Sequence, residues 1–75
     1  MPKYYRFQND APKIGENVHC YTKKDDFVSF VRMMKGQDAH FGLMKFWEIE
    51  GQFIMPDEED AIVKVISVKQ IKVTT

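Results

Sequence analysis

Four large apolar residues recur at intervals of three and four, the spacing that places side chains on one face of an α-helix: Phe27, Phe30, Val31 and Met34. Thr22 precedes this stripe as a candidate N-cap, and Gly36 follows it as a natural residue to end a helix. The pattern predicts a helix over about residues 23–35. Its apolar face should pack on a sheet, while Lys24 and Arg32 face water.

Four further segments have the aromatic and β-branched composition of strands, two before the helix and two after it: residues 3–8, 18–21, 43–50 and 62–73. Gly51 interrupts the alternation of the third segment, which resumes at residues 53–55, and the parity of the fourth changes near Ser67. Both irregularities indicate a β-bulge or a bend. The sequence therefore predicts a single α+β domain over residues 1–75. It should contain a small antiparallel sheet of four or five strands, in the order strand, strand, helix, strand, strand, with the helix on one face.

The chain is short and its charges balance. It has 75 residues, with 11 basic and 11 acidic side chains and a formal net charge of zero. A chain of this size buries only about 60% of its unfolded surface, so association with itself or with a partner would stabilise it. The lack of a basic excess argues against nucleic-acid binding. A nucleic-acid-binding module built on Lys64, Lys69 and Lys72 remains a second alternative.

No apolar run approaches the length of about 18 residues that a membrane-spanning helix requires. The chain has one cysteine and no recognisable export signal. We therefore expect a cytoplasmic protein without membrane association. A small protein of a phage or mobile element would have the same features.

Two adjacent residues, His19 and Cys20, have the chemistry of a base and a nucleophile. Neighbours on a strand point to opposite faces, so they cannot pair directly, and Cys20 fits better as a buried core residue. His40 could join His19 only through the fold. One cysteine and two histidines cannot complete a zinc quartet. The sequence therefore predicts neither a metal site nor a cofactor.

Acidic residues are concentrated in one part of the chain. Six of the eleven lie between Glu48 and Asp60, whereas the last dozen residues carry only lysines as charged groups. This asymmetry indicates either complementary neighbouring strands or an acidic docking surface. Glu48 and Glu50 share one strand face and could act as paired acid and base. Alternatively, they form a solvated face opposite lysines of the next strand.

Aromatic side chains are numerous for so short a chain, and strand alternation sends them to both faces of the sheet. One helix can cover only one face. Aromatic side chains are frequent at protein interfaces. We therefore expect an exposed interaction surface formed by Tyr4, Tyr5, Tyr21 and Trp47.

The stretch Lys45-Phe46-Trp47-Glu48-Ile49-Glu50-Gly51, the acidic turn after it, and the following strand at residues 61–68 resemble small bacterial and phage domains related to ADP-ribosyltransferases. Tyr5-Arg6 and the strand at residues 18–21 leading into a helix are similar to the start of that fold. The family uses a first-strand arginine to contact NAD and a late glutamate to orient the ribose. By resemblance, Arg6 is the counterpart of the arginine, whereas Glu48 and Glu50 lie in the wrong strand for the glutamate. The resemblance implies a reduced relative without the activity.

These observations favour a protein-interaction or accessory module without catalytic activity, which binds a protein partner or a second copy of itself. The alternative is a nucleotide binder or enzyme, in which Arg6, His19 and either Glu48 or Glu50 would meet in one cleft.

Overall fold

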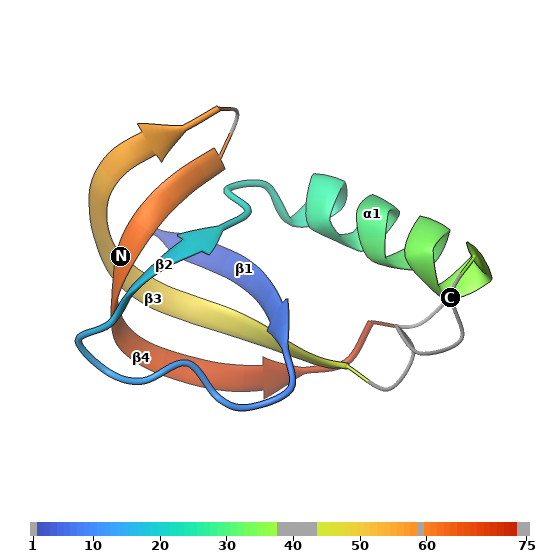
Figure 1. Ribbon diagram of the computed structural model, residues 1–75, viewed down its shortest axis with the longest axis horizontal. Helices are drawn as coiled ribbons and strands as arrows, with labels where there is room; N and C mark the ends of the chain where they lie inside the picture. The colour runs from blue at the N-terminus through green and yellow to red at the C-terminus, as the bar shows by residue number, and fades with distance from the viewer. Residues whose placement is uncertain (1, 38–43, 59, 74–75) are drawn as a thin grey trace.

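The computed structural model describes residues 2–37, 44–58 and 60–73. It has the predicted α+β fold and element order (Figure 1). The elements are β1 (Lys3–Gln8), β2 (Asn17–Cys20), α1 (Lys24–Gln37), β3 (Lys45–Asp57) and β4 (Asp60–Ile71). The described helix is neither long nor apolar enough to cross a membrane.

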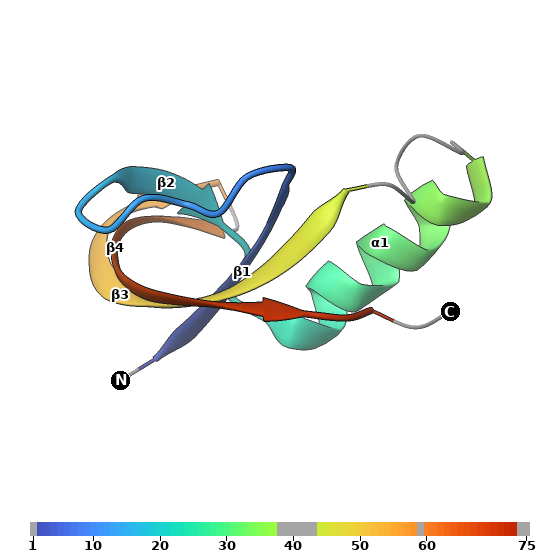
Figure 2. The same ribbon diagram turned by 90° about the horizontal axis from the view of Figure 1, so that it is seen from below.

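The four strands form one antiparallel sheet in the order β1-β3-β4-β2. The sheet curls so strongly that its two outer strands approach each other (Figure 2). The amide of Tyr5 donates to the carbonyl of Tyr21 at 3.0 Å, and the amide of Tyr21 donates to the carbonyl of Tyr5 at 2.7 Å. This isolated bridge joins β1 to the residue after β2, so the sheet is bridged into a small barrel.

Curvature is concentrated where the pairing of β3 with β4 shifts, between Glu50 and Gly51 and again between Phe53 and Met55. The first shift confirms the irregularities predicted at Gly51 and near Ser67, since Glu50 pairs with Ser67 while Gly51 pairs with Val65. A Cβ atom at Gly51 would contact the side chain of Val63 and lie 2.5 Å from the Lys64 carbonyl oxygen. Glycine is therefore required for this close approach of the two strands.

The two faces of the curled sheet have separate cores. The inner face encloses a cluster of eight buried residues: Tyr4, Val18, Cys20, Trp47, Ile49, Ala61, Val63 and Val65. The outer face packs against α1 through a second cluster: Tyr5, Phe27, Val31, Phe46 and Val73. Alternation along β1 and β3 supplies both clusters, since Tyr4 and Tyr5, like Trp47 and Phe46, point to opposite faces.

The apolar stripe of α1 faces the sheet, as predicted. Phe27 and Val31 are fully buried, whereas Phe30 and Met34 are partly buried at the edge of the contact. Lys24 and Arg32 are exposed. The predicted ends of the helix were wrong by one or two residues. The Lys23 carbonyl accepts the first helical hydrogen bond, from the amide of Phe27, so Lys23 rather than Thr22 precedes the first turn.

The carboxyl end of the helix also differs from the prediction, because α1 continues through Gly36 to Gln37. Gly36 lacks the positive φ that a terminating glycine adopts. The Lys35 ammonium donates a 2.8 Å hydrogen bond to the carbonyl of Val73, which ties this last turn to the chain that follows β4. A contact with a residue far away in the sequence therefore supports the last turn of the helix.

Candidate functional site

The predicted surface of exposed aromatic residues does not exist. Tyr4, Tyr5 and Trp47 are buried, with 6%, 7% and 8% of their surface exposed, and Tyr21 is partly buried. The expectation treated the sheet as flat, with one face uncovered. Instead the curl encloses Tyr4 and Trp47, and α1 covers Tyr5, whose ring stacks on that of Phe27. The Trp47 indole donates to the carbonyl of Gln8 at 3.0 Å, which satisfies its polar atom inside the protein.

The exposed apolar side chains lie instead on the β3–β4 hairpin. Phe53, Ile54 and Met55 are consecutive in β3 and are 52%, 43% and 54% exposed, and Ile66 of β4 is 47% exposed. We call these four residues the hairpin arm. Phe53, Ile54 and Met55 lie at the second register shift, where Phe53 pairs with Val63 and Met55 with Ile62. Ile66 lies at the first shift, between the partners of Glu50 and Gly51. Within the described residues, Ile14 and Met33 are the other large exposed apolar side chains, and neither belongs to the hairpin.

The turn that joins the two strands of the hairpin is acidic, as the sequence indicated. Asp57, Glu58 and Asp60 form what we call the acidic tip. His19 lies beside it, with its Nε2 atom 3.3 Å from Asp60 Oδ2 and 3.8 Å from Asp57 Oδ2. Asp57 and Asp60 thus pair with a histidine of the neighbouring strand β2, while Glu58 is exposed. In the part of the chain that is described, no group of three metal-binding side chains is placed to hold an ion.

The predicted catalytic candidates separate into two pairs. Arg6 and His19 come together, since Arg6 Nη1 donates to the His19 carbonyl at 2.8 Å, and Arg6 Nε donates to Gln8 Oε1. These two residues line a depression of about 140 Å³ with Phe7 and Tyr21. The ring of His19 packs edge-on against that of Tyr21, so these two side chains share a face. His40 lies outside the described residues.

Glu48 and Glu50 are not part of this depression. Glu48 pairs with Tyr5 and Glu50 with Lys3 in the β1–β3 register, so both glutamates alternate with the inward-pointing Trp47 and Ile49. The expectation that Arg6, His19 and a glutamate would share one cleft is therefore wrong.

The environment of Glu48 matches the non-catalytic interpretation. Its carboxylate lies 3.3 Å from the Lys3 ammonium, and Lys69 is its partner across the β3–β4 register. Glu48 therefore belongs to a charge-paired strand face.

Cys20 is completely buried, as predicted, and its partner on the same face is Val18, whose carbonyl lies 3.8 Å from the thiol sulfur. Burial raises the pKa of the thiol to about 11. A buried thiol with a raised pKa is a poor nucleophile, so this environment is that of a core residue.

A groove that was not predicted from the sequence lies at the opposite end of the hairpin from the acidic tip. It has a volume of about 290 Å³ and brings together the last turn of α1, the start of β3 and the end of β4. Its lining is apolar side chains together with Lys35, Lys45, Lys72 and Gln70, without a carboxylate among the described residues. We call it the basic groove. The apolar part consists of Met44, Phe46, Ile71 and Val73. The residues that line the groove are separated by up to 38 positions, from Lys35 to Val73, so local periodicity could not have identified them.

No protein-family model, curated protein or solved structure matches this chain. Its function must therefore be argued from its own surfaces.

Proposed function

We propose that this domain is a non-catalytic, cytoplasmic protein-binding module that engages its partner through the hairpin arm. The exposure of Phe53, Ile54, Met55 and Ile66 on one hairpin carries the proposal. Large apolar side chains gathered on a protein surface mark interaction sites, whereas isolated ones need no explanation. The free Cys20 is compatible with a reducing compartment.

The catalytic alternative lacks geometric support because neither Glu48 nor Glu50 lines the depression that Arg6 and His19 share. Arg6 already donates to the His19 carbonyl and to Gln8, and Glu48 is paired with Lys3. General acid–base chemistry requires groups that converge on one reacting atom. A binding role requires only the exposed surface.

The test of this proposal is a quantitative pull-down with wild-type protein and a Phe53→Thr/Met55→Thr variant, after thermal melting confirms that both fold. Threonine keeps the strand propensity while removing apolar surface. The matched control, Ile14→Thr/Met33→Gln, removes two exposed apolar side chains elsewhere. Recovery of specific partners, including untagged copies of this chain, should fall about tenfold or more only in the arm variant. Equal recovery by all three proteins would disprove the proposal.

Nucleotide binding in a reduced relative of the ADP-ribosyltransferases is a second candidate. Its supporting observation is that Arg6 lines a depression beside the rings of His19 and Tyr21. At about 140 Å³ this depression is smaller than the range of about 300–1,000 Å³ typical of ligand pockets. The candidate predicts that saturating NAD raises the melting temperature and that Arg6→Lys weakens the effect. An unchanged melting temperature in the wild-type protein would eliminate it.

A further inference from the structure

The surfaces at the two ends of the β3–β4 hairpin have complementary chemistry. At one end, the arm and the tip offer apolar side chains beside the carboxylates of Asp57 and Glu58. At the other end, the basic groove offers an apolar floor beside lysines. We propose that the tip and arm of one copy bind in the basic groove of a second copy, so that the chain associates head to tail. This inference rests on the proposed function, because it names the partner of the hairpin arm.

The groove is suited to receive a carboxylate next to an apolar group. The Lys35 ammonium is fixed over it, since it donates to the Val73 carbonyl at 2.8 Å and lies 5.2 Å from the centre of the Phe46 ring. An ammonium group has three N–H donors, of which Val73 takes one. Lys45 and Lys72 are exposed at the rim. An incoming acidic group would therefore meet three positive charges around a surface that also accepts an apolar side chain.

The hairpin supplies such a ligand. Met55 is 54% exposed and lies two residues before Asp57, whose side chain is 47% exposed. Glu58 follows in the turn between β3 and β4, at the end of the hairpin, and has a positive φ of 56°. An apolar side chain and two carboxylates thus lie within four consecutive residues at the tip end of the hairpin.

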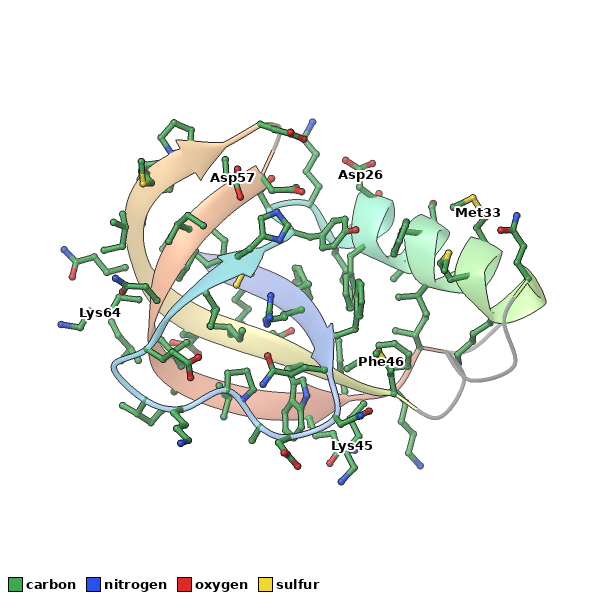
Figure 3. All side chains as sticks on the ribbon, viewed as in Figure 1. Asp26, Met33, Lys45, Phe46, Asp57 and Lys64 are labelled. Carbon is green, nitrogen blue, oxygen red and sulfur yellow. The ribbon has the colours of Figure 1, made fainter. Side chains whose placement is uncertain are left out.

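The geometry makes the contact intermolecular. Lys45 begins β3 at the groove and Asp57 ends it at the tip, while β4 runs back from the tip to Ile71 at the groove. Figure 3 shows the labelled Lys45 and Phe46 at the opposite end of the hairpin from Asp57. The tip of a chain therefore lies away from its own groove. Since two different surfaces meet, the contact yields a reciprocal pair, a larger closed ring or an open chain.

The experiment measures association by sedimentation velocity over a concentration series. Wild-type protein should form dimers, in which each tip occupies the other copy's groove, or larger rings and chains, and these species should dissociate as salt screens the charges. Lys45→Glu/Lys72→Glu reverses charges in the groove, and Asp57→Lys/Glu58→Lys reverses them at the tip. Each variant alone should associate at least about tenfold more weakly than the wild type.

Mixing the two variants is the decisive step. The groove variant keeps a native tip and the tip variant keeps a native groove, so a single native contact can form between them. The opposite ends of that pair carry a glutamate-bearing groove and a lysine-bearing tip, which are also complementary. Association should therefore return in the mixture. A chain carrying all four substitutions should likewise associate with itself.

Matched controls change the net charge equally at exposed residues that belong to neither surface: Lys13→Glu/Lys24→Glu and Asp10→Lys/Glu16→Lys. They should associate like the wild type. A wild-type protein that stays monomeric at about 1 mM overturns the inference. A mixture of groove and tip variants that fails to associate also overturns it. So does a result in which the tip substitutions weaken self-association and the groove substitutions do not, because this would indicate arm-to-arm pairing. In these cases the pull-down can still establish the arm as a binding surface for another protein, so the two proposals fail separately.

Discussion

The main chains of Tyr5 and Tyr21 exchange two hydrogen bonds, and this bridge connects the two outer strands of the curled sheet. The amides of both residues should therefore resist hydrogen exchange about as strongly as the amides of the β3–β4 ladder. Exchange of either amide at the rate of the exposed loop at residues 9–14 would show that the bridge opens readily.

The close approach at Gly51 predicts a large effect from the addition of one methyl group. Gly51→Ala would press a Cβ atom against the Val63 side chain and the Lys64 carbonyl, and should lower the free energy of unfolding by about 1–3 kcal/mol or more. Gly36→Ala is the matched control, because a Cβ atom there meets nothing within 4 Å. In a helix it should stabilise by about 0.5–1 kcal/mol. Urea denaturation of the two variants should give shifts of opposite sign.

The packing of the helix predicts which alanine substitutions in its apolar stripe destabilise the protein most. Phe27 is fully buried and packs against Tyr5 and Phe46, so Phe27→Ala should cost about 3–5 kcal/mol of unfolding free energy. Phe30 is only partly buried, so Phe30→Ala should cost less. Because the whole domain is stable by only a few kcal/mol, the Phe27 variant should be largely unfolded by circular dichroism. Equal melting temperatures for the two variants would contradict the packing described above.

Cys20 predicts the response of the protein to alkaline pH. Its pKa is raised by burial from 9.0 to about 11, so the folded state holds the thiol proton where the unfolded state releases it. The associated stability is present below pH 9 and is lost as the pH rises from 9 to about 11. Burial also raises the pKa of Tyr5 and of Tyr21, which adds to the loss in the same direction. Urea midpoints should fall over this range.

The same burial predicts slow modification of the thiol. At pH 8, a thiol reagent should label the native protein far more slowly than protein unfolded in urea, because the native thiol is both inaccessible and protonated. Comparable labelling rates in the two states would show that Cys20 is accessible in solution.

The features predicted correctly from sequence are those set by neighbouring residues. The spacing of Phe27 and Val31 determines a helical face, and the separation of His19 from Cys20 follows from strand alternation. Gly51 interrupts a local pattern, and its position coincides with a register shift. Each of these inferences uses a period of two or 3.6 residues and needs no knowledge of the partner strand.

The curvature of the sheet and the register of its strands could not be predicted from local periodicity. Alternation assigns Tyr4 and Trp47 to one face, but it does not indicate that the sheet closes around that face and buries them. The separation of Arg6 from Glu48 becomes evident only when β1 is known to pair with β3, which places Glu48 opposite Tyr5. The basic groove likewise depends on the contact of Lys35 with Val73, which are far apart in the chain.

The strand order also has a consequence for folding. β1 and β2 are made first, yet they pair with β3 and β4, which follow the helix in the chain. The local β3–β4 hairpin can form without distant contacts, whereas adding β1 requires closing a loop of about half the chain, between Gln8 and Lys45. We therefore expect the sheet to start from its carboxyl-terminal hairpin. During synthesis, the aromatic first strand must remain without its sheet partner until most of the domain has been made.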